Sequence, residues 1–233
     1  MADNIARMLA AAIAPDPGRP LLTWYDDATG DRTELSGATL DNWVAKTANL
    51  LVDAAAVAPG DRAGVSLPPH WQSAAVLLGC WSAGIEVTVD PTEPVDVLFV
   101  AADRIDRATG WSAGERYALA LAPLAAPLRQ VPAGYADYVV EVRGQGDHYT
   151  PYPGGGPQDA ELCARAAVRA VALGITAGDR VLFDAARHPD PVDWLLAPLS
   201  VGASIVLCAQ LDPDRLADRV ATERVTVDLT RAG

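Results

Sequence analysis

Hydrophobic residues fall into short continuous runs and longer stretches with a spacing of three or four, the patterns of buried strands and amphipathic helices. In the first half of the chain, a helix is expected over residues 40–51. A buried strand is then expected over 63–67, a helix over 71–82 and a strand over 85–89. The stripe that predicts the first helix consists of Leu40, Trp43, Val44, Thr47, Ala48 and Leu51.

The same order of elements recurs in the second half. The pattern predicts helices over 161–173 and 194–199, and strands over 181–183 and 204–208. Glycines are expected to end the connecting helices, at Gly84 in the first half and Gly202 in the second. Two matched strand-helix-strand crossovers predict an α/β fold with a mostly parallel sheet, helices on both faces and two similar βαβ halves.

The remaining segments fit around these two crossovers. Further helices are expected at the N-terminus and near the C-terminus, and the last strand is expected at an edge of the sheet. The expected ranges are a helix over 8–14, a hairpin of 22–25 with 32–35, strands over 96–101, 137–142 and 225–229, and helices over 115–128 and 214–223.

A glycine- and proline-rich segment, residues 143–158, divides the chain. Proline removes backbone donors and glycine costs conformational entropy, so this segment is expected to be a loop. We therefore expect one α/β domain over residues 1–233, with halves of approximately 20–142 and 159–233 joined by the loop.

The charge balance excludes several partners. A net charge of -12 and a pI near 4.5 disfavour nucleic acids and anionic membranes, which require a cationic face. The N-terminus lacks the basic start of a signal peptide, and the apolar stretch 194–211 is interrupted by Pro198 and Gly202, so a cytoplasmic protein is expected. The arginine-rich composition, with Lys46 as the single lysine, is typical of a high-GC bacterial genome.

Three cysteines, Cys80, Cys163 and Cys208, are widely spaced along the chain. Buried free thiols are expected, rather than a disulfide or a metal site. The three histidines have no ligand spacing with one another or with the cysteines, and no metal site is expected.

Residues 20–91 resemble the opening of the adenylate-forming superfamily, which includes acyl-CoA synthetases and the adenylation domains of nonribosomal peptide synthetases. The matching segments read LDNWVAKTANLLVD, GDRAGVSL, LLGCWSAG and EVTVDP, in the family's order. Residues 173–227 resemble a later segment of the family through LGITAGDRVLF, WLLAPLSVGASIVL and LDPDRLADRV.

The family's phosphate loop, Tyr-Thr-Ser-Gly-Thr-Thr-Gly-x-Pro-Lys, aligns with residues 149–158 without a gap. Four positions match the motif: Tyr149, Thr150, Gly155 and Pro157. The other positions depart from it. Proline stands at 151 and 153, Tyr152 replaces the first glycine, Gly154 replaces a threonine, Gly156 fills the variable position, and Gln158 replaces the lysine.

These departures remove the groups through which a phosphate loop binds. Two backbone donors are deleted by proline, the motif's hydroxyl groups at positions 151, 153 and 154 are lost and the cation is missing, so ATP and magnesium are not expected to bind. The resemblance also implies an adenine and metal motif and a catalytic lysine in later segments of the family, which this chain ends before reaching. No catalytic residue is therefore assigned.

A ligand cleft could lie near His188 and Trp194. His188 resembles a histidine that many acyl-activating members carry before the acyl pocket, and the alternative is a loop histidine bonded to the backbone. The pattern Gly144-x-Gly146 is not followed by a helix, so it does not indicate a dinucleotide site.

Three functions remain open. The first is a catalytically inactive adenylate-forming-like domain that serves as a binding or regulatory module. The second is part of an adenylating enzyme completed in trans by another chain, with a protein partner or a second copy meeting the C-terminal edge strand. The third is a sensor of a small acyl or nucleotide ligand.

Overall fold

The structure is a computed structural model and describes residues 4–230. The chain divides into two compact units. Unit 1 contains Met1–Leu40, Pro69–Ala74 and Asp159–Gly233, and unit 2 contains Asp41–Pro68 and Ala75–Gln158. Within the described residues each unit holds one five-stranded sheet, so the strands form two sheets instead of the one that the sequence predicted.

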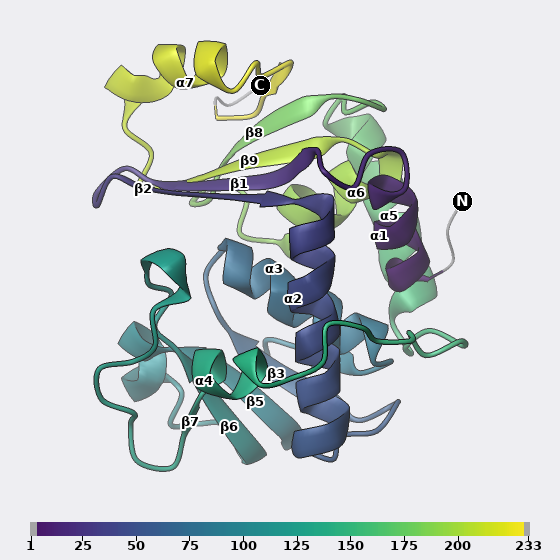
Figure 1. Ribbon diagram of the computed structural model, residues 1–233, viewed down its shortest axis with the longest axis vertical. Coiled ribbons are helices and arrows are strands. Elements are labelled where there is room, and N and C mark those ends of the chain that lie inside the picture. Colours follow the sequence, from purple (N-terminus) through teal and green to yellow (C-terminus); the bar gives the residue numbers. More distant parts are fainter. Residues whose placement is uncertain (1–3, 231–233) are drawn as a thin grey trace. The chain divides into compact units, whose positions relative to one another are not determined.

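The sheet of unit 1 has the strand order β10-β8-β9-β1-β2 (Figure 1). Only β2 is antiparallel to its neighbour, and β1 lies parallel to β9 with Leu22 opposite Ile205. The strands are β1 (Pro20–Asp26), β2 (Asp31–Ser36), β8 (Arg180–Asp184), β9 (Ser204–Ala209) and β10 (Val227–Asp228). The hairpin that was predicted over 22–25 and 32–35 is formed by β1 and β2, and it joins the sheet that contains the strands of the second half, β8 and β9.

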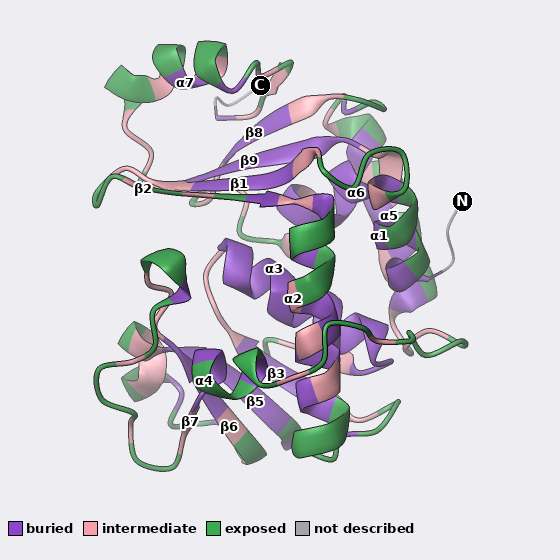
Figure 2. Ribbon diagram, in the orientation of Figure 1, coloured by how far each residue is buried: buried purple, intermediate pink, exposed green. Residues whose placement is uncertain are grey.

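Both faces of this sheet are covered. Leu182, Val206 and Cys208 form a buried cluster on one face, against which Leu216 and Val220 of α7 pack. Strand β9 also contacts α6 and the π-helical turn η4. The middle of β8 and nearly the whole of β9 are buried (Figure 2). The helical elements are α1 (Ile5–Ile13), α5 (Asp159–Ala172), η4 (Val192–Leu196), α6 (Ala197–Val201), η5 (Pro213–Arg215) and α7 (Leu216–Thr222).

The sheet of unit 2 is parallel throughout, with the order β4-β3-β5-β6-β7. Phe99 stacks on Tyr117 and meets Tyr138 edge-on, at centroid distances of 5.5 and 6.0 Å. The Tyr138 hydroxyl lies 2.7 Å from the Thr47 hydroxyl. The strands are β3 (Arg62–Ser66), β4 (Glu86–Thr88), β5 (Val95–Ala101), β6 (Ala113–Leu119) and β7 (Ala136–Asp137).

The other helical elements end or lie within unit 2. Helices α2 and α3 each start in unit 1 and continue into unit 2. The elements are α2 (Gly37–Asn49), η1 (Leu50–Ala54), α3 (Trp71–Ser82), η2 (Ala102–Arg107), η3 (Pro123–Ala125) and α4 (Tyr138–Arg143). No helix of the described part of the chain is both long and apolar enough to cross a membrane.

The α/β class, both βαβ crossovers and most of the predicted elements are confirmed. Gly84 and Gly202 follow α3 and α6 with φ of +75° each, the left-handed conformation expected where a glycine ends a helix.

Two predicted elements are wrong. Residues 115–128, expected as a helix, form the end of β6 and an irregular segment, because β6 pairs with β5 and prolines interrupt the residues after it. Residues 137–142, expected as a strand, form mostly α4. The Asp137 carboxylate accepts hydrogen bonds from the backbone N–H groups of Val139 and Val140, which caps this helix.

Candidate functional site

Residues 149–158 form an irregular loop in unit 2, as expected. The Tyr152 N–H donates to the Ser82 carbonyl at 3.0 Å, and the Gly155 N–H donates to the Tyr152 carbonyl at 3.1 Å. The Tyr152 ring packs against Gly84, where a Cβ atom would lie 2.9 Å from the ring. Two of the loop's N–H groups are therefore already bonded within the protein.

Gln158, which the sequence analysis aligned with the lysine of the phosphate-loop motif, pairs with the edge strand β4. Its Oε1 accepts from the Val87 N–H and its Nε2 donates to the Val87 carbonyl, both at 3.0 Å. The side-chain amide thus mimics a neighbouring strand and satisfies both polar groups of one edge residue. A lysine could donate to the carbonyl but could not accept from the N–H.

Side chains of α2 bind residues 145–148, which lead into this loop. Lys46 Nζ donates to the Gln145 carbonyl and pairs with Asp147, both at 2.6 Å. Asn49 Nδ2 donates to the carbonyls of Gly146 and His148. The Lys46 side chain is only 22% exposed, because it is engaged with Gln145 and Asp147.

The remaining predicted loop residues are placed at the surface. Tyr149, Gly155 and Gly156 are partly buried, while Thr150, Gly154 and Pro157 are exposed. Burial, together with the nearby charge of Asp53, raises the pKa of Tyr149. The phenol is therefore neutral at pH 7 and adds no charge to the loop.

His188 and Trp194 belong to unit 1. His188 Nε2 lies 3.1 Å from the Leu229 carbonyl, its Nδ1 lies 3.6 Å from an Asp193 oxygen, and its ring meets Phe183 edge-on. Trp194 is 1% exposed in the core. These contacts agree with a loop histidine bonded to the backbone, while a ligand role for either residue stays a prediction.

Asp193 also pairs with Arg169, whose Nε and Nη2 donate to its two oxygens at 2.6 and 2.8 Å. Burial alone would raise the pKa of Asp193, but the hydrogen bonds and charge of Arg169 outweigh it, and the pKa lies below its usual value. Arg169 and Asp193 line a hollow of about 450 Å³, together with Arg165, Asp190 and Val192.

A polar network that the sequence did not reveal lies beneath α7. Glu223, at the end of this helix, accepts hydrogen bonds from Tyr25, Arg32 and Arg180. Its side chain is only 4% exposed. Burial by itself would raise the pKa of Glu223, but these donors prevail and lower it.

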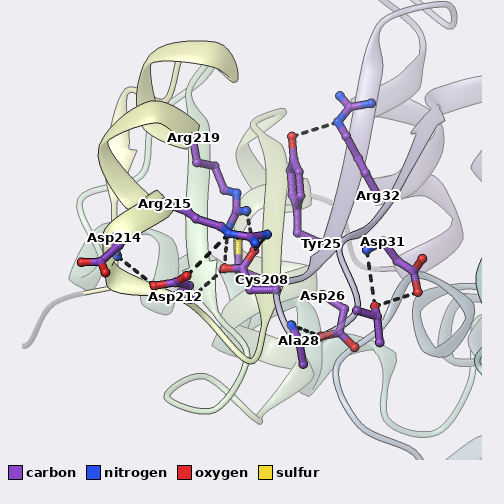
Figure 3. A network of polar contacts seen from close by, with 12 residues as sticks. Tyr25, Asp26, Ala28, Asp31, Arg32, Cys208, Asp212, Asp214, Arg215 and Arg219 are labelled. Carbon is purple, nitrogen blue, oxygen red and sulfur yellow. Dashed lines mark hydrogen bonds and ion pairs between the residues drawn. The ribbon is translucent and has the colours of Figure 1, made fainter.

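Arg219 extends this network towards the turn between β1 and β2. It donates to both carboxylate oxygens of Asp27 at 2.6 and 2.9 Å, approaches Cys208 Sγ at 3.3 Å and stacks over the Tyr25 ring. Figure 3 shows Arg219 reaching from α7 toward Cys208, with Tyr25 beside it. The Gly-Asp-Arg that contains Arg180 was visible in the sequence, but a single sequence does not show that β1 would lie next to β9 and bring Tyr25 to Glu223.

The cysteine prediction is confirmed. Cys80, Cys163 and Cys208 are buried and form no disulfide. Burial raises the pKa of Cys80 to about 12 and that of Cys208 to about 11. Both of these thiols are protonated at pH 7 and are poor nucleophiles. Within residues 4–230 no group of three or more His, Cys, Asp or Glu side chains could hold a metal ion.

No family model matches the sequence. A protein of Mycobacterium tuberculosis (strain ATCC 25618 / H37Rv) described as a TIGR03089 family protein is 44% identical over 231 residues, which is 94% of this chain and 95% of the relative. The chain belongs to the TIGR03089 family.

The TIGR03089 chain shares its fold with adenylate-forming enzymes. It superposes on the Brucella canis acyl-CoA synthetase with a TM-score of 0.74 and 17% identity, covering 97% of this chain and 46% of that one. Acetoacetyl-CoA synthetase from Streptomyces lividans superposes with a TM-score of 0.71 and 19% identity, covering 95% of this chain and 41% of that one. The N-terminal domain of FACL13 from Mycobacterium tuberculosis superposes with a TM-score of 0.67 and 16% identity, covering 98% of this chain and 62% of that one.

The resemblance predicted from the sequence is therefore confirmed at the level of the fold. This TIGR03089 chain spans about half the length of the solved synthetases that it matches. At these identities the likeness concerns architecture, and any activity must be argued from the residues of the chain itself.

Proposed function

We propose that this TIGR03089 chain is a catalytically inactive domain of the adenylate-forming fold that serves as a binding or regulatory module. The observation that carries the proposal is the pairing of Gln158 with both backbone groups of Val87. At the position where the related motif has a cation, this chain has a neutral amide that is occupied by a strand edge.

The chemistry of adenylation supports the proposal. A phosphate-binding loop stabilises the pyrophosphate through convergent N–H groups and a cation, and charge-assisted contacts are about twice as strong as neutral ones. Residues 149–158 contain no lysine or arginine, three of them are proline, and two of their N–H groups bond to protein carbonyls. The one lysine of the chain is engaged with Gln145 and Asp147.

A second candidate is an adenylating enzyme completed by another chain. The edge strand β10 favours it, because this two-residue strand pairs with β8 on one side and no other described strand covers its free edge. An exposed strand edge is a template for pairing with a partner.

Exchange of radiolabelled pyrophosphate into ATP tests the proposal with a panel of carboxylic acids. We expect no acid-dependent exchange by the wild-type chain or by Gln158→Lys, because restoring one cation leaves the prolines in place and removes the pairing with Val87. An active acyl-CoA synthetase serves as the positive control. Acid-dependent exchange by the isolated chain would overturn the proposal, and exchange that appears only with a co-purified protein would favour the second candidate.

A further inference from the structure

A hollow of about 530 Å³ lies in unit 1, where β1, β8 and β9 begin and the segment after α7 passes. Its lining includes four arginines and two glutamates. We call it the arginine hollow, and its charged residues are Arg19, Arg32, Arg180, Arg224, Glu34 and Glu223. The volume is within the usual range for a small-molecule site.

The charge of the arginine hollow is opposite to that of the chain. Four arginines and two glutamates give its lining a net charge of 4 − 2 = +2, whereas the whole chain carries -12. A concave positive region in an acidic protein concentrates anions and excludes cations.

Two of the arginines are already neutralised. Arg180 pairs with Glu223, and Arg32 pairs with Glu223 and Glu34. These pairs fix the guanidinium groups in place, because Glu223 is buried and also bonded to the Tyr25 hydroxyl. They form a rigid wall of the hollow.

The other two arginines have no carboxylate partner among the described residues. Arg19 Nη2 donates to the Gly202 carbonyl at 3.2 Å, which leaves its other donors for a ligand, and Arg224 is exposed. An arginine guanidinium offers five donors in a planar fork that matches the oxygens of a phosphate group.

Hydroxyl groups complete the lining. Ser204, Thr222 and Thr226 contribute, and the Ser204 and Thr226 hydroxyls are oriented by bonds to Asp179. Because each of these two hydroxyls already donates its one proton to Asp179, the Thr222 hydroxyl is the additional donor that the lining offers to a phosphate oxygen. The Asp179 carboxylate itself is held by Thr226 and Thr176, and these hydrogen bonds lower its pKa.

We propose that the arginine hollow binds a small phosphate-bearing anion, with Arg19 and Arg224 as its primary contacts. The site belongs to unit 1, whereas the loop 149–158 belongs to unit 2. The proposal therefore does not depend on the proposed function, and pyrophosphate exchange and anion binding can succeed or fail separately.

Calorimetric titration with pyrophosphate at constant ionic strength tests the site. We expect saturable binding by the wild-type chain that weakens by about tenfold or more in Arg224→Gln, as for the loss of one charge-assisted contact. Arg19→Gln is expected to behave alike, but it also loses the bond to Gly202, so Arg224→Gln is the decisive variant. Arg129→Gln, an exposed arginine of unit 2, is the matched control and should bind as the wild type does.

A second variant, which removes a negative charge from the lining, is expected to change binding in the opposite direction. It tests whether the charge of the hollow controls the affinity for pyrophosphate. Glu34→Gln removes a negative charge from the lining and leaves Arg32 with Glu223 as its carboxylate partner, so it should tighten pyrophosphate binding several-fold, about as expected for one nearby charge. Titration with inorganic phosphate and with sodium sulfate then distinguishes a phosphate site from one that accepts any dianion. The proposal is overturned if the wild type shows no saturable binding, or if Arg224→Gln and Arg129→Gln bind pyrophosphate equally.

Discussion

Glu223 shows at the scale of a single residue how this fold buries charge. One carboxylate accepts hydrogen bonds from Tyr25, Arg32 and Arg180, which come from three different strands. A buried ion that is surrounded by donors is tolerated, whereas removing one partner leaves the others without an acceptor.

Replacement of this carboxylate should therefore destabilise the protein. Glu223→Gln places an amide group against two arginines and is expected to lower the free energy of unfolding by about 3 kcal/mol. Urea denaturation measures the change. Glu161→Gln is the control, because Glu161 is 77% exposed and lies 4.0 Å from Arg165. An equal effect of both substitutions would contradict the role given to Glu223.

The same contacts predict how stability depends on pH. The pKa of Asp27 is lowered chiefly by hydrogen bonds from Arg219, and that of Glu223 is lowered because its three donors outweigh burial. Both folded pKa values lie below the unfolded values of 3.8 and 4.5. Their stabilisation is complete above those values and is lost as the pH falls through the folded pKa values.

Urea denaturation at a series of pH values measures this loss. The free energy of unfolding should fall steadily below about pH 5, and the fall should be shallower in Glu223→Gln, which has one carboxylate fewer to protonate. A curve of the same steepness in both proteins would show that Glu223 does not contribute to the acid sensitivity.

At the scale of elements, the packing of the sheet of unit 2 depends on the close approach of the Trp111 ring to Gly64. Gly64 lies in β3, and a Cβ atom there would lie 2.6 Å from Trp111 and 2.9 Å from Leu98. Trp111 and Leu98 belong to a buried cluster with Val95 and Val100. Only glycine, which has no Cβ atom, leaves room for the Trp111 ring to pack directly against β3.

Gly64→Ala is expected to destabilise the protein by about 1–3 kcal/mol, because a methyl group would be forced into a filled core. Thermal and urea unfolding measure the effect. Gly110→Ala is the matched control, since its Cβ would meet no atom closer than 4.0 Å. A neutral result for Gly64→Ala would mean that the Trp111 ring can shift without cost.

Most elements could be predicted from the sequence because their periodicity and their end signals agree. The two errors arose where local preference and tertiary context disagree. Residues 115–128 are rich in alanine and leucine, which favour a helix, but pairing with β5 makes their start a strand. Residues 137–142 are rich in valine, which favours a strand, but the cap at Asp137 starts a helix.

At the scale of the whole molecule, the fold and its likeness to adenylate-forming enzymes could be anticipated, but part of the candidate site could not. The departures in the loop 149–158 were visible residue by residue, yet the partner of Gln158 was not, because Val87 lies 71 positions away. The arginine hollow was not visible either, because its residues converge only when β1 pairs with β9.

The measurement that tests the central claim most directly is calorimetric titration of the Arg224→Gln variant with ATP and magnesium, since this variant weakens phosphate binding at the arginine hollow. The account predicts no magnesium-dependent heat of binding, because Gln158 is engaged with Val87 and the loop offers no cation. Saturable, magnesium-dependent binding of ATP that is abolished by substitutions within residues 149–158 would contradict the account.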